Sequence, residues 1–397
     1  MQKRIYLDNA AATQVDEEVL QAMLPFFRET YGNPSAFYSF AKDAEKAVSK
    51  ARQETADLIG AKPAEIYFTA GGSESDNWAI QSVAQSYAEQ GKHIITSRIE
   101  HHAVLHTCEY LEKQGFEVTY LDVDSAGQVS IEGLQKAIRP DTILVSVMAA
   151  NNEIGTLEPL AKIGQAVHER GVLFHTDAVQ AYGHIPLDVE AMQIDLLSAS
   201  GHKLNGPKGA GFLYIRQGVK IGLLIHGGAQ ERGRRAGTLN VPGIVGLGTA
   251  ARLAGERMAE RAAREAKLRD YLIGRVMGEI PYVRLNGHAS DRLPNNASFC
   301  FRFIEGESLL ILLDQAGICA SSGSACTSGS LDPSHVLLAI GLPHEIAHGS
   351  LRITLSAENT TEELDYVVEI LKKSIERLRS MSPLYEDFVA AGNEFGR

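Results

Sequence analysis

Short apolar segments alternate with helical patterns over the first half of the chain, and this alternation limits the folds that it can form. Helical patterns occur at 74–89, 103–114 and 160–170. Seven segments rich in β-branched and aromatic residues are strand candidates: EIYFTA, HIITS, EVTYLDV, TILVSVMAA, VLFHTDA, DLLSAS and GFLYIR. Strands that are apolar along most of their length and alternate with helices are typical of a mostly parallel sheet covered on both faces. We therefore predict an α/β fold with a large sheet.

The second half of the chain has a different pattern, which predicts a smaller α+β domain. A glycine-rich segment, IGLLIHGGAQERGRRAGT, follows the last strand candidate, and a long charged helix is expected over about 246–279. Two further strands, ASFCFRF and SLRITLS, precede a closing helix that is expected over about 361–379. The tail SPLYEDFVAAGNEFGR is polar and contains glycine, so we expect it to be loosely held.

The length of the chain, 397 residues, exceeds the usual size of a single hydrophobic core. We therefore expect two domains. The large domain is placed at 15–255, and the small domain, which carries the cysteine loop described below, is placed at 1–14 and 256–397.

Charge and hydrophobicity argue against several classes of protein. A formal net charge of −11 disfavours binding to nucleic acid, which needs a basic surface. The first residues lack the apolar core of a signal peptide, and no stretch approaches the ~20 apolar residues of a membrane-spanning helix. The four cysteines form no CxxC pair, so neither a zinc site nor a disulfide framework is indicated. We expect a soluble cytoplasmic protein that binds no metal, nucleic acid or membrane.

One cysteine lies in a setting that is unusual for a structural residue. Cys326 is part of ICASSGSACTSGSLDPSH, which has no large apolar side chain between Ala320 and Ser330. A structural cysteine packs among apolar side chains, and a disulfide needs a partner at a suitable distance. We interpret Cys326 as a displayed, reactive thiol, against the alternative of a tolerated surface cysteine. The other cysteines lie in apolar patterns and are expected to be structural: Cys108, Cys300 and Cys319.

Three further segments predict a cofactor site. Lys203 follows a strand in SASGHKLNGPKG, Asp177 ends the strand in VLFHTDA, and FTAGGSESDN places glycines and hydroxyls between a strand and a helix. Each has a simpler reading, namely a solvated lysine, a helix cap, or a turn capped by Ser73 or Ser75. The glycine segment matches neither common nucleotide-binding motif. Together, a phosphate anchor, a carboxylate and a lysine able to form a Schiff base indicate pyridoxal 5'-phosphate.

The order of these segments resembles a known family. YLDNAAAT, GNPS, FTAGGSESDN, EHHAV, ANNEIGT, HTDAVQ, SGHKLNGPKG, RRAGT, SSGSACTSG and SLRITLS follow one another as in cysteine desulfurases of the NifS/IscS type. These form a class-V branch of the aspartate aminotransferase fold, and the resemblance is greatest to NifS. It implies a fold type I pyridoxal phosphate enzyme with a seven-stranded, mostly parallel sheet.

The resemblance implies roles for individual residues around the cofactor. Lys203 would bind the cofactor as a Schiff base, Asp177 would pair with its ring nitrogen, and His101 would stack on the ring and take part in catalysis. The remaining cofactor contacts would come from Gln180 at the ring oxygen, from Gly72, Ser73, Ser200 and His202 at the phosphate, from Asn152, and from Thr238 at the phosphate of a partner subunit. The implied assembly is a homodimer.

The implied substrate is L-cysteine, with its carboxylate held by Asn33, Asn152 and Arg352. Lys203 would move the α-proton, and the thiolate of Cys326 would attack the substrate sulfur, leaving a persulfide on the enzyme and releasing alanine. An iron–sulfur scaffold protein would then accept the sulfur. The chain departs from the family at GNPSAFYSFA, and Ser73 stands where threonine is usual.

Three other functions fit the same sequence. A selenocysteine lyase or an aminotransferase could use the same fold, and a non-turnover sulfur-relay protein could retain it. Lys203 and Asp177 argue against a relay protein, because a relay needs neither. The segments QERGRRAGT and GSLDPSHVLLA favour a role in nitrogen fixation over the housekeeping branch.

Overall fold

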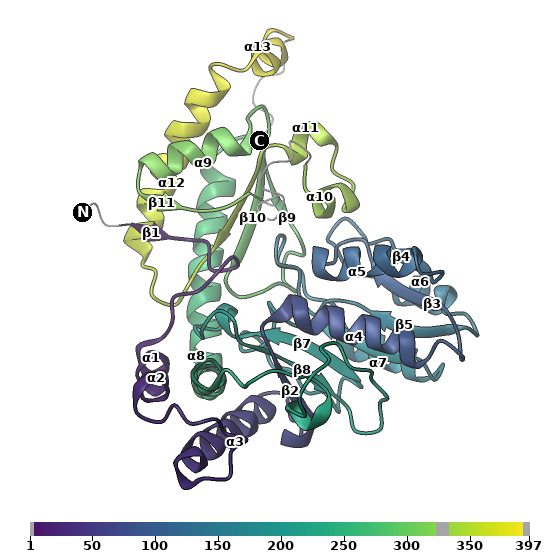
Figure 1. Ribbon diagram of the computed structural model, residues 1–397. Coiled ribbons are helices and arrows are strands. Elements are labelled where there is room, and N and C mark those ends of the chain that lie inside the picture. Colours follow the sequence, from purple (N-terminus) through teal and green to yellow (C-terminus); the bar gives the residue numbers. More distant parts are fainter. Residues whose placement is uncertain (1–3, 323–332, 392–397) are drawn as a thin grey trace.

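A seven-stranded sheet forms the centre of the larger part of the molecule (Figure 1). The computed structural model describes residues 4–322 and 333–391. The strands lie in the order β2 (Ile66–Thr69), β8 (Gly211–Ile215), β7 (Leu196–Ser200), β6 (Leu173–Asp177), β5 (Thr142–Ser146), β3 (His93–Ser97) and β4 (Glu117–Leu121). β8 is antiparallel to both neighbours, and the other adjacent strands are parallel. All seven strand predictions and the mostly parallel sheet are confirmed.

Both faces of this sheet are buried, because successive side chains along a strand point to opposite faces. Leu144 and Leu196 pack in the core beneath α4 (Gly72–Ser86) and α5 (His102–Glu112). Their neighbours Val145 and Leu197 pack in a second core on the other face. The helices of that second face are α1 (Glu17–Met23), α3 (Lys42–Asp57), α6 (Ile131–Ala137), α7 (Leu160–His168) and the first part of α8 (Val241–Glu279).

The smaller part of the molecule has its own core. Its antiparallel sheet has the order β12 (Ser350–Thr354), β10 (Asn296–Phe301) and β9 (Val283–Asn286), and β1 (Ile5–Tyr6) pairs in parallel with β11 (Ile318–Cys319). The second part of α8, α9 (Gly306–Gln315) and α12 (Thr361–Arg379) cover these strands. Three short helices complete this description: α2 (Pro25–Arg28), α10 (His335–Ala339) and α11 (His344–Ala347). The predicted strands in ASFCFRF and SLRITLS are present, whereas β9 was not predicted.

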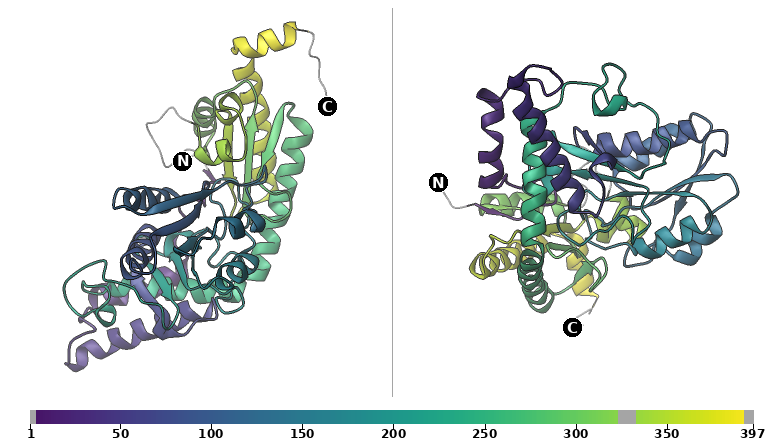
Figure 2. Two further views of the ribbon diagram at one scale, coloured as in Figure 1. Left: turned by 90° about the vertical axis from the view of Figure 1, so that its right-hand side faces the viewer. Right: turned by 90° about the horizontal axis from the view of Figure 1, so that it is seen from below.

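Helix α8 joins the two cores. Ile244 near its start belongs to the core of the large sheet, and Leu268 and Leu272 belong to the smaller core. The helix begins at Val241, five residues before the predicted start, and residue 255, where the sequence places the domain boundary, lies inside it. Figure 2 shows an elongated molecule with α8 running along it, α3 near one end and α13 (Pro383–Ala390) at the other.

Half of the tail that was expected to be loosely held forms a helix. Residues Pro383–Ala390 form helix α13. Tyr385 and Phe388 are three residues apart and therefore share a face of that helix. The ring of Phe388 lies 5.3 Å from that of Tyr282 and 4.8 Å from that of Phe303. These aromatic contacts, which the polar composition of the segment hides, attach the helix to the small domain.

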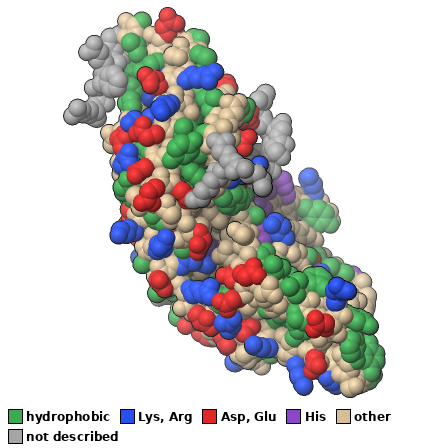
Figure 3. Space-filling model, turned by 90° about the vertical axis from the view of Figure 1, so that its left-hand side faces the viewer, with side chains coloured by type: hydrophobic (Ala, Val, Ile, Leu, Met, Phe, Trp, Pro, Cys, Tyr) green, Lys and Arg blue, Asp and Glu red, His purple; other side chains and the backbone are tan. Residues whose placement is uncertain are grey.

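The surface and the helices carry two further observations. On the face drawn in Figure 3, acidic and basic side chains are interspersed, so the described residues there form no continuous basic surface. Within 4–322 and 333–391, none of the helices combines the length and the apolar character needed to cross a membrane.

Candidate active site

A cavity of about 270 Å³ lies at the carboxyl ends of the parallel strands β6 and β7. This edge of an α/β sheet is where ligands bind. Residues from the N-terminal segment, the large sheet and strand β12 of the small domain share its lining. Ten of the predicted site residues line it: Gly72, Ser73, His101, Asn152, Asp177, Gln180, Ser200, His202, Lys203 and Arg352.

Asp177 is the last residue of β6 and is only 5% exposed. Its Oδ1 accepts a hydrogen bond from the backbone N–H of Val179 at 2.9 Å. Burial raises the pKa of this carboxyl, although His101 and Lys203 act in the opposite direction. A cationic group in the cavity would therefore find a preformed partner in Asp177.

Lys203 reaches the same cavity from the end of the 3₁₀ turn Gly201–Lys203, directly after β7. Its Nζ donates to the carbonyl oxygens of Ala10 at 2.5 Å and Ala11 at 2.8 Å. The side-chain amide of Gln180 also donates to the Ala10 carbonyl, at 3.0 Å. The N-terminal segment thus fixes both side chains near Asp177.

His101 is both a helix cap and a cavity residue. Its Nδ1 accepts from the backbone N–H of Ala103 at 3.1 Å at the start of α5. Because Nδ1 is an acceptor, the hydrogen of the neutral ring is on Nε2. This leaves Nε2 as the ring atom that can exchange a proton with a ligand.

An anion-binding surface adjoins the cavity at the start of α4. The first N–H groups of a helix have no partner within the helix and bind anions. Gly72 begins α4, and a Cβ atom there would lie 2.5 Å from Val179 Cγ2, so only glycine fits without a shift. The hydroxyl of Ser200 is 2.7 Å from His202 Nδ1, and burial, with the nearby lysines, lowers the pKa of His202 to about 4. His202 is therefore neutral at pH 7.

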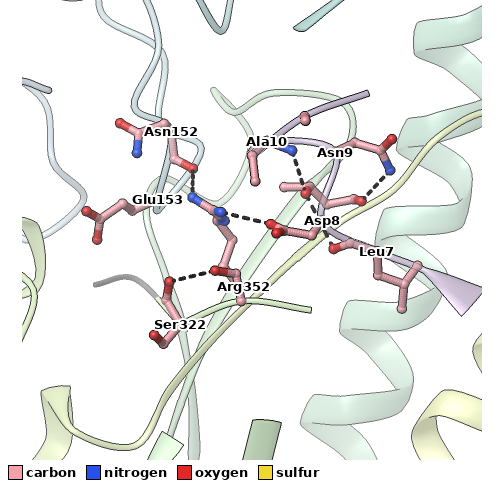
Figure 4. A network of polar contacts seen from close by, with 12 residues as sticks. Leu7, Asp8, Asn9, Ala10, Asn152, Glu153, Ser322 and Arg352 are labelled. Atoms are coloured by element: carbon pink, nitrogen blue, oxygen red, sulfur yellow. Dashed lines mark hydrogen bonds and ion pairs between the residues drawn. The ribbon is translucent and has the colours of Figure 1, made fainter. Parts of the chain in front are cut away.

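Arg352 approaches the cavity from the small domain and is 3% exposed. Its Nη1 donates to the backbone carbonyl of Asn152 at 3.1 Å, and its Nη2 donates to Asp8 Oδ1 at 2.9 Å (Figure 4). Its guanidinium is thus held at the edge of the site, where it can bind a carboxylate.

Two predicted site residues do not line this cavity. Asn33 is exposed and its Oδ1 accepts from the backbone N–H of Ser35 at 3.0 Å, and Thr238 is also exposed. Neither lines the cavity of a single chain. Cys326 lies outside the described residues. Cys108 and Cys300 are buried, as predicted for structural residues, whereas Cys319 is only half-buried.

Three residues at or beside the site were not predicted. Lys208 lines the anion-binding surface next to Ser200 and His202. It lies in the quoted stretch SGHKLNGPKG, so its charge was the available signal. Asp76 lines the cavity from α4, and Asp8 contacts Arg352.

Comparison with known proteins identifies the family. A family model described as Aminotransferase class-V matches residues 5–367. The chain belongs to this family. The predicted fold class is confirmed.

Individual members of the family are similar over almost the whole chain. One is a protein named cysteine desulfurase IscS from Methanosarcina thermophila, 58% identical over 382 residues that cover 96% of this chain and 94% of that protein. A solved NifS-like protein has a TM-score of 0.88 and 43% identity, covering 95% of this chain and 99% of that one. A structure of SspA in complex with cysteine has a TM-score of 0.80 and 39% identity, covering 90% and 100%.

Pyridoxal 5'-phosphate is the cofactor of this class-V aminotransferase. The residues present fit it. Asp177 is a buried carboxylate suited to a protonated ring nitrogen, and Lys203 is the amine suited to its aldehyde. The start of α4, with Ser200 and His202, is suited to its phosphate.

Proposed function

We propose that this class-V aminotransferase is a cysteine desulfurase, a pyridoxal phosphate-dependent sulfurtransferase that converts L-cysteine to L-alanine. The observation that carries the proposal is the convergence of Lys203, Asp177, His101 and Arg352 on one cavity. The similarity to a curated cysteine desulfurase over 96% of the chain supports the same reaction.

Different residues carry out substrate binding, proton transfer and control of the cofactor ring. Arg352 binds the substrate carboxylate, Lys203 Nζ takes the α-proton, and His101 Nε2 is positioned to exchange a proton with the substrate. Asp177 keeps the cofactor ring protonated. The bound cofactor supplies an electron sink for the electrons that the α-proton leaves behind.

Cys326 takes the sulfur in this proposal. Its thiolate forms an S–S bond with the substrate sulfur as the C–S bond of the substrate breaks, so that cysteine and a thiol become alanine and a persulfide. The electron pair of the broken C–S bond stays on the β-carbon, which takes up a proton and becomes the methyl group of alanine. The persulfide then passes to an acceptor.

The acceptor and the assembly are also part of the proposal. We propose that the chain acts as a homodimer, that the partner subunit's phosphate site receives Thr238, and that an iron–sulfur scaffold protein is the acceptor. A cytoplasmic location and a dedicated role in nitrogen fixation stay predictions. A pull-down that retrieves only a housekeeping scaffold would contradict the latter.

The first experiment measures alanine and sulfide together after the purified holoenzyme receives L-cysteine and a reducing thiol. Equal yields in many-fold excess over enzyme are expected. Keto acid without sulfide would indicate an aminotransferase, and the absence of turnover would indicate a relay protein. A higher kcat/KM for selenocysteine than for cysteine would favour a selenocysteine lyase.

Two variants test the assigned residues. Lys203→Ala and Cys326→Ala should each reduce sulfide release by about 10³-fold or more, because each removes a group that bonds to the reacting atoms. Cys319→Ala is the matched thiol control and should retain activity, because Cys319 is half-buried in β11 and does not line the cavity. Sulfide release at the normal rate by Lys203→Ala would refute the mechanism.

A further inference from the structure

Arg352 has more hydrogen-bond donors than its protein contacts use. Its two terminal nitrogens are held by the Asn152 carbonyl and by Asp8, at 3.1 and 2.9 Å. Its Nε is buried and has no partner among the described residues. Buried polar groups are normally satisfied, so an unpaired donor on a residue that lines the cavity points to a ligand acceptor.

Asp8 acts on this guanidinium from outside the cavity. It contacts Arg352 but is not among the residues that line the cavity, and its side chain is 20% exposed, compared with 4% for that of Arg352. Figure 4 shows Asp8 and Asn152 on different sides of the guanidinium. Two fixed contacts set the plane of the group and therefore the direction in which its remaining N–H groups point.

The backbone on either side of Asp8 is fixed to the strand that carries Arg352. The N–H of Thr354 donates to the carbonyl of Leu7 at 2.8 Å, and the N–H of Ala10 donates to Thr354 Oγ1 at 2.9 Å. The side chain of Asn9 donates to the Thr354 carbonyl at 2.9 Å. Asp8 is therefore held at a constant position relative to Arg352.

Asp8 also reduces the positive charge that Arg352 offers to a ligand. The carboxyl of Glu153 is buried close to Arg352, and burial raises its pKa to about 7, although Arg352 acts in the opposite direction. Asp8 is in direct contact with the guanidinium, at 2.9 Å, and already compensates its positive charge. A substrate carboxylate is thus bound by oriented N–H groups more than by an excess of positive charge.

We propose that Asp8 is a positioning residue for the substrate carboxylate: it holds Nη2 of Arg352 so that the unpaired Nε–H is directed to the α-carboxylate of an amino acid. This inference rests on the proposed function for the identity of the substrate. It requires only that the ligand be an α-amino acid.

The test compares ligands with and without a carboxylate. The holoenzyme and its Asp8→Ala and Asp8→Asn variants are titrated calorimetrically with L-alanine and with ethylamine, which lacks the carboxylate. Asp8→Ala should weaken L-alanine binding by about tenfold, the loss expected for one charge-assisted contact, with ethylamine unchanged. The L-alanine affinity of Asp8→Asn, which keeps an oxygen acceptor, should lie between those of wild type and Asp8→Ala. In turnover, KM for L-cysteine should rise by the same factor while kcat changes little.

Two controls separate positioning from a structural role. Asp122→Ala removes an exposed aspartate whose Oδ1 is 2.7 Å from Arg98 Nε and which does not line the cavity, and it should leave both titrations unchanged. In an Arg352→Ala background, adding Asp8→Ala should have no further effect on L-alanine affinity. This double-variant comparison also decides the matter if ethylamine binds too weakly to measure.

The outcomes distinguish the two proposals. Unchanged L-alanine affinity in Asp8→Ala, an equal loss for both ligands, or a full loss in the Arg352→Ala background would overturn the role of Asp8. Failure of the wild-type enzyme to release sulfide from L-cysteine would contradict the proposed function instead, and leaves the L-alanine titration informative.

Discussion

Glu100, which precedes His101, is a carboxyl that the fold buries completely. Its Oε1 accepts from Ser97 Oγ at 2.6 Å and from the Met148 N–H at 2.9 Å, whereas its Oε2 has no partner among the described residues. Burial raises the pKa of Glu100 to about 8. The folded state therefore retains a proton that the unfolded state loses above about pH 4.5, so this residue lowers the stability as the pH rises from about 4.5 to 8.

Replacing Glu100 by glutamine should remove this pH dependence. The amide keeps the acceptor oxygen but cannot ionise, so Glu100→Gln should be more stable than wild type by on the order of 4 kcal/mol at pH 8, and by about 1 kcal/mol or less at pH 5. Urea unfolding at the two pH values measures the difference. An equal effect of the substitution at both pH values would show that Glu100 does not carry the proton.

The position of a single residue in the site can be predicted from the sequence only where the adjacent residues show which element it ends or begins. Asp177 and Ser200 end apolar segments, so their meeting at one edge of the sheet follows from the strand pattern. Asp8 and Arg352 are 344 positions apart, and their contact depends on how the N-terminal segment packs beside β12. Nothing in the spacing of these two residues indicates that contact.

Among the elements, α3 and α8 approach each other closely at a glycine. A Cβ atom on Gly248 would lie 2.4 Å from the Cα of Ala51. Backbone atoms cannot yield as a flexible side chain can, so the helices would have to move apart to accept any larger residue.

Two glycines of the same helix should therefore respond in opposite ways to substitution by alanine. Gly248→Ala should destabilise the protein by about 1–3 kcal/mol through the forced separation of α3 and α8. Gly274→Ala is the matched control, because nothing lies within 4 Å of a Cβ built there. The higher helix propensity of alanine should raise the free energy of unfolding by roughly 0.5–1 kcal/mol. Chemical denaturation of the two variants measures both effects, and a stabilising Gly248→Ala would contradict the close packing.

Helices and strands were predicted correctly where their own sequence has a clear hydrophobic or capping pattern. The seven strands of the large sheet lie in largely apolar segments, and α12 was placed at its observed limits, Thr361–Arg379, where Thr360 caps its first turn. Strand β9, Val283–Asn286, was missed because it is only four residues long and mixes apolar and polar residues, and α13 was missed because its aromatic contacts are made with distant residues.

Across the whole molecule, the cofactor site joins segments that are otherwise held by separate cores. Removing the cofactor should lower the thermal stability of the entire chain, because the buried Asp177 loses its cationic partner and the N-terminal segment, α4 and β12 lose a shared ligand. A cofactor concentration of about 100 times its Kd should contribute about 2.7 kcal/mol.

The loss of thermal stability on removal of the cofactor should depend on Asp177. In Asp177→Asn the side chain keeps its shape but not its charge, so the difference in melting temperature between the forms with and without cofactor should shrink. Differential scanning calorimetry of the four samples measures this, with the absorbance of the bound cofactor as a check on occupancy. An undiminished difference would mean that Asp177 does not contribute to cofactor affinity.

The unbroken course of α8 has a mechanical consequence. Its 39 residues extend for about 58 Å at 1.5 Å per residue. The helix is fixed in one core near its start and in the other near its end, so it works as a stiff lever between them. A tilt of about one degree at one end displaces the other by about 1 Å over this length. The angle of α8 therefore contributes to the distance between Arg352 and Lys203, together with the N-terminal segment, which contacts Lys203 through Ala10 and Ala11 and Arg352 through Asp8.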